Sequence, residues 1–278
     1  MLDNTVAGWL KTGDGLKLYT EKNEVHNARA TVLIMHGLAE HLGRYHYTVK
    51  NFNKSGLSVY RFDLRGHGRS EGRKGYLDHL DNYLSDTELA FKWINADCPT
   101  LPLFGLGHSM GSLIAAAYGI KYPGRFSGQI FSAAAAINLP IFQELRLIDL
   151  NHIPGKTMSN SLANLISHDQ DFIKDYLQDP LVLNEITYKL LCEVFVRGTD
   201  WLIKNLSRYN CPCLILHGGD DQIVIPESAK HLFENITSVD KTLKLYDGLY
   251  HDILNESEKD MIIKDICQWI ADRLPSKL

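Results

Sequence analysis

Residues 107–111 have the sequence Gly-His-Ser-Met-Gly and place Ser109 where an apolar run, residues 101–106, meets a helical one, residues 112–118. A sharp strand-to-helix turn exposes a serine hydroxyl, and glycines two residues before and after it avoid side-chain clashes in the turn. At the start of the helix, the N–H of Met110 would face a developing oxyanion. Such a short pattern also occurs by chance, so the interpretation depends on this context. We expect Ser109 to be a nucleophile.

A serine hydroxyl needs a base to take its proton and a carboxylate to orient that base. His251 follows the last predicted strand, and Asp220 and Asp221 follow the strand before it. The carboxyl ends of parallel strands share one sheet edge, so these groups can meet there. Neighbouring side chains point oppositely, so one aspartate orients His251 and the other can bind loop N–H groups, with only a modest advantage for Asp221. The order Ser109, Asp221, His251 is that of α/β-hydrolases.

A second oxyanion donor is expected after the first apolar strand, where Leu38 follows a His-Gly pair. Glycine lets a loop turn its N–H groups inward, so Leu38 is placed to donate together with Met110. We expect His67, which lies in a glycine-rich turn, to be structural. We expect the same of His108 and His217.

Predicted strands and helices alternate along most of the chain, after an N-terminal hairpin with an Asp-Gly turn. The strands are apolar on both faces, which is typical of a mostly parallel central sheet with helices on each side. The fold class is therefore α/β. The predicted strands are residues 30–35, 57–62, 101–106, 126–131, 213–216 and 241–246, and the predicted helices are residues 47–54, 80–96, 112–118, 227–235 and 256–273.

The alternation stops after Asn138 and resumes after Leu206. The intervening segment is helical in composition, has no convincing strand, and is interrupted at residues 152–155 and at Asp179-Pro180. Its apolar helical face either packs on the core or belongs to a cap over the strand ends, and we favour the cap because the sheet pattern resumes afterwards. That face comprises Leu139, Phe142, Leu145 and Ile148. The expected organisation is a core of residues 1–137 and 207–278 and an inserted cap of residues 138–206.

Composition argues against several functions. Lys and Arg number 29 against 33 Asp and Glu, a net charge of −4 without a basic block, so nucleic-acid binding is not expected. The five cysteines form no C-x-x-C pair, and we expect no metal and no organic cofactor. Free thiols suit a reducing compartment. Residues 1–5 do not resemble the start of a signal peptide, and no apolar run approaches about 18 residues, so we expect a cytoplasmic protein that is at most peripheral to a membrane.

Several longer blocks of specific sequence occur along the chain. They are HGLAEHLGRY at residues 36–45, DLRGHGRS at 63–70, GHSMGS at 107–112, DPL at 179–181, HGGDD at 217–221 and YH at 250–251. Together they resemble the monoacylglycerol lipase family of α/β-hydrolases over nearly the whole chain, although the cap matches poorly beyond Asp-Pro-Leu. The resemblance implies an α/β-hydrolase fold with a helical cap.

The same resemblance implies roles for individual residues. Ser109 aligns with the family's nucleophile, Asp221 with its orienting acid and His251 with its base. Leu38 and Met110 align with the oxyanion donors. No cofactor is implied.

Glu40 and Arg44 fall where the family places polar residues near the alcohol-binding end of the site. An alternative is that the two residues belong to a salt-bridge network that holds the oxyanion loop. The implied reaction converts monoacylglycerol to fatty acid and glycerol through an acyl-enzyme. The expected partners are a small lipid ester and, through the cap, a micelle or membrane surface, while the oligomeric state is left open.

Three other functions remain open from the sequence. A general carboxylesterase or lysophospholipase could use the same triad. A peptidase would need cap acids to hold an ammonium group, for which Glu144, Asp149 and Asp175 are candidates. A ligand-sensing protein on the same fold is disfavoured by the intact triad.

Overall fold

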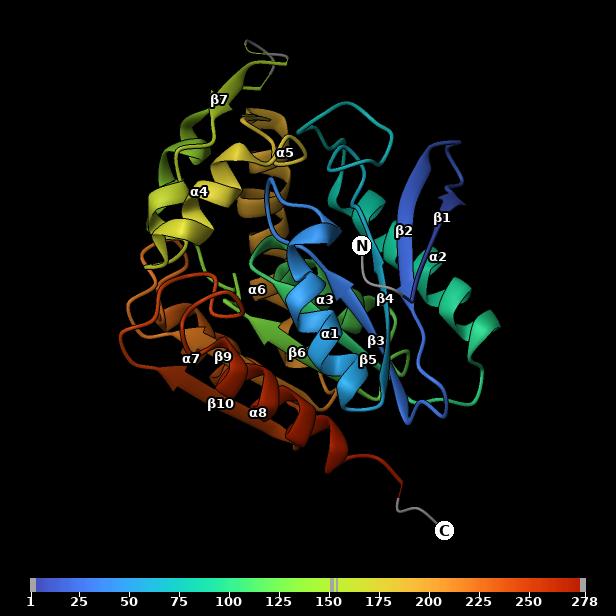
Figure 1. Ribbon diagram of the computed structural model, residues 1–278. Helices are drawn as coiled ribbons and strands as arrows, with labels where there is room; N and C mark the ends of the chain where they lie inside the picture. Colours follow the sequence, from blue (N-terminus) through green and yellow to red (C-terminus); the bar gives the residue numbers. More distant parts are fainter. Residues whose placement is uncertain (1–3, 151–152, 154, 276–278) are drawn as a thin grey trace.

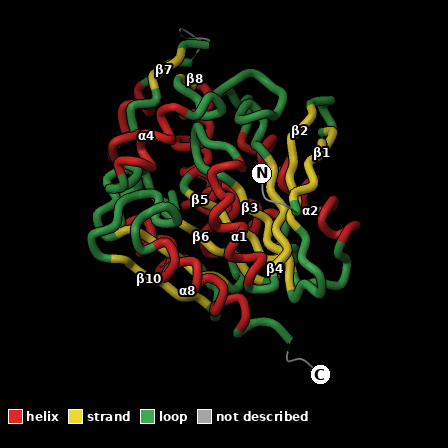
Figure 2. Tube along the Cα trace, viewed as in Figure 1, coloured by secondary structure: helices red, strands yellow, loops and turns green. Residues whose placement is uncertain are grey.

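An eight-stranded sheet forms the centre of the computed structural model, which describes residues 4–150, 153 and 155–275 (Figures 1 and 2). The strand order is β1-β2-β4-β3-β5-β6-β9-β10. β1 and β2 form the N-terminal hairpin, β2 also pairs antiparallel with β4, and all other pairs are parallel. The predicted mostly parallel sheet is confirmed. The strands are β1 (Thr5–Lys11), β2 (Lys17–Asn23), β3 (Ala30–Met35), β4 (Leu57–Phe62), β5 (Leu103–His108), β6 (Gly128–Ser132), β9 (Cys213–Gly218) and β10 (Lys241–Tyr246).

Helices cover both faces of the sheet, because successive residues of each apolar strand face opposite sides. In β3, Val32 and Ile34 pack with α1 and α8, whereas Leu33 and Met35 pack with α2 and α3. Figure 1 shows α1 and α8 together on the near side of the sheet. No helix among the described residues is long and apolar enough to cross a membrane. The core helices are α1 (His46–Lys54), α2 (Leu80–Asp97), α3 (Met110–Lys121), α7 (Glu227–Asn235) and α8 (Lys259–Ala271).

Three helices begin at positions that differ from the prediction, and for α1 the difference is a single residue, His46 instead of residue 47. α3 begins at Met110, directly after the strand, instead of at residue 112. α8 begins at Lys259 instead of at residue 256. The reason for the shift of α8 is that Glu256 is buried, at 1% exposure, and its side chain binds other segments instead of starting the helix.

Residues 138–206 lie at one end of the sheet, where Figure 1 shows α4, α5 and β7 together. The expectation that this segment contains no strand is wrong, since β7 and β8 pair antiparallel. Each has three residues, too few for a recognisable alternation. The elements are β7 (Thr157–Ser159), α4 (Gln170–Gln178), β8 (Glu185–Thr187), α5 (Tyr188–Cys192), a π-helical segment (Glu193–Gly198) and α6 (Thr199–Asn205). The division into core and cap stays a prediction; residues 1–3, 152 and 154, parts of the predicted N-terminus and cap interruption, lie outside the described residues.

Three residues of the apolar face predicted early in this segment are buried and the fourth, Ile148, is half-buried just after the helix, which is of the 3-10 type (Pro140–Leu147). A 3-10 helix has three residues per turn, so Leu139, Phe142 and Leu145 lie on one side. All three are at most 7% exposed. The ring of Phe142 stacks on that of Phe195, with centroids 4.3 Å apart, and so joins the two ends of the segment.

An ion pair is buried where β2 meets β4. Arg61 is fully buried, and its Nη2 donates to Glu21 Oε2 (2.7 Å) and Asn23 Oδ1 (2.8 Å). Its Nη1 donates to the carbonyl of Leu42 (2.9 Å). Burial lowers the pKa of Arg61 to about 10, although the Glu21 charge opposes this shift. The pair fixes the loop after β3 to the neighbouring strands.

We expect Glu21→Gln to lower the free energy of unfolding by about 3–5 kcal/mol, because it leaves a buried guanidinium without its carboxylate. Urea denaturation measures this loss. Asp200→Asn is the matched control: it breaks the Arg146–Asp200 pair (2.7 Å), whose side chains are 35% and 38% exposed. The control should lose less than about 1 kcal/mol. Equal losses in the two variants would contradict the prediction.

Candidate active site

Ser109 lies on the turn between β5 and α3 in a strained conformation, with φ 53° and ψ −117°. Its N–H donates to the carbonyl of Ser132 (2.8 Å). A Cβ on Gly107 would lie 2.4 Å from the carbonyl oxygen of Gly111, and a Cβ on Gly111 would lie 2.1 Å from that of Met35. Only glycine fits at either position, so the G-x-S-x-G spacing is a packing requirement of this turn.

Asp221, rather than Asp220, meets His251. His251 Nδ1 donates to Asp221 Oδ2 (2.7 Å), and Asp220 is exposed. Asp221 also binds the loop N–H groups that we expected Asp220 to bind. Its Oδ1 accepts from the N–H of Ile223 (2.9 Å) and of Val224 (3.0 Å). One carboxylate therefore closes the loop and orients the imidazole.

The two groups shift each other's pKa. Burial alone would raise the pKa of Asp221, but the charge of His251 and hydrogen bonds from His217 and His251 hold it well below its usual range. Burial alone would lower the pKa of His251, but the charge and hydrogen bond of Asp221 outweigh it and raise that pKa. Because Nδ1 is engaged, Nε2 is the nitrogen left for Ser109, which lines the same cavity as His251.

The loop after β3 presents Leu38 to this cavity. Buried His36 supports the loop: its Nδ1 donates to the carbonyl of Gly37 (2.8 Å), and its Nε2 accepts from the N–H of Leu64 (3.0 Å). Burial holds the pKa of His36 well below its usual value. Met110 is the first residue of α3, where N–H groups lack acceptors within the helix. Both expected oxyanion donors therefore lie in segments adjoining the serine.

A narrow cavity of about 30 Å³ lies between the core and residues 138–206. Its wall is mostly apolar, as in sites for small organic ligands. The lining residues are Leu38, Glu40, Ser109, Phe142, Asn160, Leu162, Ile166, Tyr176, Phe195, Ile223, Val224 and His251. Glu144, Asp149 and Asp175, the acids that a peptidase would need, are exposed and do not belong to this wall as the described residues define it.

Glu40 and Arg44 occupy different environments. Glu40 is 7% exposed, lines the cavity and accepts from the hydroxyl of Tyr45 (3.0 Å). The Arg44 guanidinium lies over the rings of Phe172 (4.5 Å) and Tyr176 (5.2 Å), and its Nε and Nη2 are buried without hydrogen-bond partners. Glu40 thus faces the cavity directly, and Arg44 stands behind the Tyr176 ring that lines it.

A polar network also holds the loop that carries these residues. His41 Nε2 lies 2.8 Å from Asp179 Oδ2, which ties the loop to the Asp-Pro-Leu block. Glu40 Oε2 accepts from the N–H of Gly37 at 3.4 Å. Polar contacts of both His41 and Glu40 therefore hold this loop, and the choice between an alcohol site and a loop-holding network stays open for Glu40 and Arg44.

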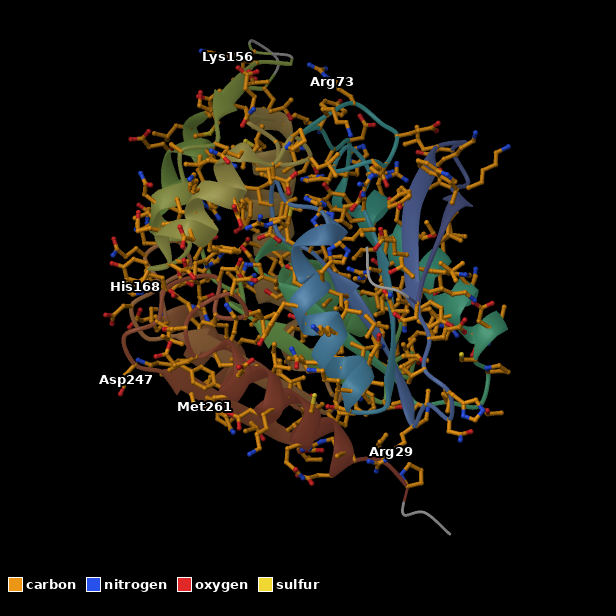
Figure 3. All side chains as sticks on the ribbon, viewed as in Figure 1. Arg29, Arg73, Lys156, His168, Asp247 and Met261 are labelled. Atoms are coloured by element: carbon orange, nitrogen blue, oxygen red, sulfur yellow. The ribbon has the colours of Figure 1, made fainter. Side chains whose placement is uncertain are left out.

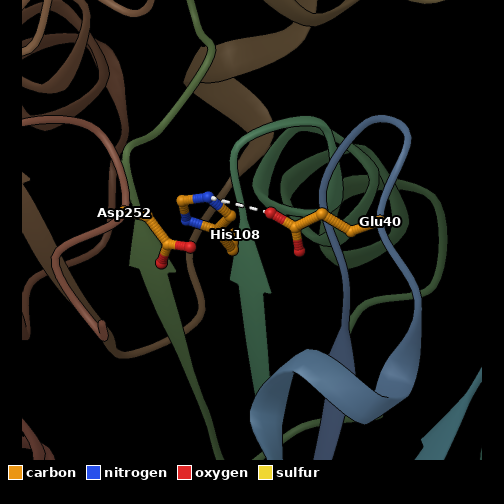
Figure 4. Close-up of side chains that lie close together, drawn as sticks. All are labelled: Glu40, His108 and Asp252. Carbon is orange, nitrogen blue, oxygen red and sulfur yellow. Dashed lines mark ion pairs between the residues drawn. The ribbon is translucent and has the colours of Figure 1, made fainter. Parts of the chain in front are cut away.

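Glu40 belongs to a buried group with His108 and Asp252 (Figure 4). His108 Nε2 lies 3.7 Å from Glu40 Oε1, and His108 Nδ1 lies 3.1 Å from Ser132 Oγ. Burial and the charge of Asp252 raise the pKa of Glu40 to about 7, and burial lowers that of His108 to about 4. One ligand atom from each lies within 4.8 Å of the others, a grouping not repeated among the described residues. The side-chain nitrogen of Asn255 lies 3.1 Å from both carboxylate oxygens of Asp252 and supplies this carboxylate with a donor.

Glu256 adjoins the site, although no sequence pattern indicates it, since Asn-Glu-Ser-Glu looks like an ordinary polar helix start. The buried carboxylate accepts from the N–H of Tyr250 (3.1 Å), the residue before His251. It also accepts from Ser167 Oγ (3.1 Å) and from the N–H of His168 (3.2 Å). The His168 ring, which reaches the surface (Figure 3), lies 3.6 Å from that of Tyr250. The loop that carries His251 is therefore joined to residues 167–168.

A strained serine, a histidine–aspartate pair and a mostly parallel sheet define a serine hydrolase of the α/β class. The family described as "Serine aminopeptidase, S33" (Hydrolase_4) matches residues 26–258, and the chain belongs to it. A monoacylglycerol lipase of Mycolicibacterium smegmatis is 33% identical over 251 residues, which cover 88% of this chain and 89% of the relative. Human monoglyceride lipase is 27% identical over 252 residues, covering 88% of this chain and 83% of its own.

Solved structures agree with these sequence matches. The monoacylglycerol lipase of Paleococcus ferrophilus superimposes with a TM-score of 0.82 at 30% identity, covering 92% of this chain and 99% of its own. A soluble variant of Saccharomyces cerevisiae monoglyceride lipase, in complex with a substrate analog, gives a TM-score of 0.85 at 25% identity, covering 97% and 96%. The predicted α/β-hydrolase fold and the resemblance to monoacylglycerol lipases are confirmed.

The raised pKa of Glu40 predicts a pH-dependent stability. The folded state holds the proton more tightly than the unfolded state, so it loses stability as the pH rises from about 4.5 to about 7. Glu40→Gln removes this titration. Its free energy of unfolding, relative to wild type, should therefore rise by up to about 3 kcal/mol between pH 4.5 and pH 8.

Urea denaturation at both pH values measures this change. Glu185→Gln, at an exposed position of β8, is the control and should follow wild type at both. Parallel stability curves for wild type and Glu40→Gln would show that Glu40 titrates normally.

Proposed function

We propose that the chain is a carboxylic ester hydrolase that cleaves monoacylglycerol to fatty acid and glycerol. The observation that carries the proposal is the His251–Asp221 hydrogen bond (2.7 Å) beside a cavity that Ser109 also lines. The lipases that the chain resembles, at up to 33% identity, support the choice of ester.

The reaction proceeds through an acyl-enzyme. His251 Nε2 takes the proton of Ser109 Oγ as this oxygen attacks the ester carbonyl. The N–H groups of Leu38 and Met110 stabilise the oxyanion, and Asp221 stabilises the imidazolium. The ester C–O bond then breaks, and His251 returns the proton to the departing glycerol oxygen. Water, deprotonated by the same nitrogen, attacks the acyl-enzyme, and Ser109 regains its proton as the fatty acid leaves.

The cavity wall suits an ester with one apolar and one polar end. Phe142, Leu162 and Phe195 supply apolar surface for an acyl chain. Glu40 and Asn160 supply polar groups for the glycerol hydroxyls. With a pKa of about 7, Glu40 can either donate or accept near neutral pH. Arg44 supports this end through the Tyr176 ring on which it stacks.

Hydrolysis of a matched panel tests the substrate: a monoacylglycerol, a diacylglycerol and a lysophospholipid of one acyl length, and a short-chain ester. We expect the highest kcat/KM for the monoacylglycerol and a loss of at least about 1,000-fold in Ser109→Ala. A fluorophosphonate probe should label wild type but not this variant. Ser127→Ala, at an exposed serine, is the control for both assays.

The panel separates the alternatives. Preference for the lysophospholipid or the short ester, with Ser109-dependent labelling, would keep the triad and replace the substrate. Specific binding of the lipid with neither labelling nor turnover would instead favour a ligand-sensing protein.

We also propose that residues 138–206 contact a micelle or membrane surface, from which the lipid ester enters. Ile141, Leu147 and Leu177 are 41%, 87% and 58% exposed. Such apolar side chains gain free energy on entering a lipid interface. A reducing compartment such as the cytoplasm suits the cysteines, all of which are free: Cys98, Cys192, Cys211, Cys213 and Cys267.

Leu147→Ser should weaken binding to phosphatidylcholine vesicles about 5–10-fold, because one apolar side chain no longer enters the lipid. Vesicle co-sedimentation measures the change, and turnover of a short-chain ester should stay at the wild-type level. Val239→Ser is the matched control, since Val239 is 101% exposed but lies outside residues 138–206. Equal effects of the two substitutions would assign membrane contact to a different surface.

A further inference from the structure

His217 is a buried histidine that the proposed reaction does not use. It lies in β9, is 0% exposed, and directs Nε2 toward two acceptors. The carbonyl oxygen of Val224 lies 2.6 Å away, and Asp221 Oδ2 lies 3.2 Å away. Its Nδ1 is buried without a hydrogen-bond partner.

The carbonyl of Val224 fixes which nitrogen of His217 carries a hydrogen. A carbonyl oxygen only accepts, so Nε2 must donate. Asp221 Oδ2, the oxygen that accepts from His251 Nδ1 at 2.7 Å, lies 3.2 Å from the same nitrogen. Two imidazole nitrogens therefore lie within 3.2 Å of one carboxylate oxygen, while backbone N–H groups donate to the other.

We propose that His217 is a positioning residue for the hydrolysis, and that its Nε2–H holds Asp221 and limits how strongly this carboxylate attracts the proton of His251. The inference rests on the proposed function, since it acts through the same triad. Burying Nδ1 without a partner costs folding free energy. An apolar residue would avoid that cost but could not donate to Asp221.

Other charged and titratable groups face the same imidazole and must be distinguished from His217. Asp221, Asp252 and Glu40 each raise the pKa of His251. The His108 ring lies 4.9 Å from that of His251. Substitution of His217 leaves all of these in place, so a change in the pH profile reports the lost donor.

Three substitutions separate the donor from the bulk of the ring. In His217→Gln the amide nitrogen can reach the place of Nε2, in His217→Asn it reaches only as far as Nδ1, and in His217→Phe no donor remains. Each is compared with His26→Phe, at an exposed position. The measurements are kcat and KM, the pH profile of kcat/KM, the rate of fluorophosphonate labelling, and Tm.

We expect His217→Gln to keep kcat within about 3-fold of wild type, whereas His217→Asn and His217→Phe lose about 10-fold or more with little change in KM. Without the donor, Asp221 holds the imidazolium of His251 more strongly. The acid limb of kcat/KM should therefore move to higher pH in His217→Asn and His217→Phe, and labelling should slow in parallel.

Unchanged kcat values and pH profiles in all three variants would overturn the proposal. An equal loss of kcat in all three, including His217→Gln, would also overturn it if Tm falls and the pH profile does not shift, because the role of His217 would then be structural. Labelling with the fluorophosphonate probe keeps the test of His217 separate from the test of the substrate assignment. If Ser109 reacts with the probe but monoacylglycerol is not hydrolysed, the substrate assignment fails while the variants still decide the role of His217. Failure of wild type to label at Ser109 would overturn both.

Discussion

The close approach of α3 to β3 is the constraint on which the site depends. Gly111 lies so near the carbonyl of Met35 that no side chain fits between helix and strand. This contact forces the helix to begin one residue after Ser109 and leaves the serine with φ 53°. A conformation of this kind costs about 1–3 kcal/mol, which the surrounding sheet must offset. The hydrogen bond from Ser109 to Ser132 shows how β6 contributes.

Buried carboxyl groups in and beside the site meet the cost of burial in different ways. Asp221 stays ionised because His251 and two backbone N–H groups donate to it and a second imidazole nitrogen, of His217, lies 3.2 Å away. Glu256 is surrounded by donors from two separate segments. Glu40 has fewer donors and a carboxylate neighbour in Asp252, so its proton affinity rises instead. Asp221, beside the proposed base His251, therefore carries a full negative charge, whereas Glu40, where a neutral substrate hydroxyl is expected, holds its proton more tightly.

Local patterns predicted most of the core but little of the segment above it. Apolar runs located β3, β4 and β9 because these strands are buried on both faces. The order of Ser109, Asp221 and His251 located the candidate triad, because parallel strands end at one edge of the sheet. The strands β7 and β8 escaped prediction since each is only three residues long and is held by tertiary contacts. Glu256 and Asp252 escaped it as well, because a buried acid leaves no periodic signal and its partners lie far away in the sequence.

The carboxylate of Glu256 has a consequence for how the two parts of the chain can change over evolution. Its donors come from Tyr250, beside the proposed base, and from Ser167 and His168, some 80 residues earlier. A replacement for residues 138–206 that lacks those donors would leave a buried carboxyl group without hydrogen-bond partners beside the loop of the proposed base. Recombination between relatives must therefore transfer residues 167–168 and Glu256 together, or neutralise Glu256 in the same step. Residues 138–206 can therefore vary where they surround the substrate, but residues 167–168 must stay matched to Glu256, just before the terminal helix.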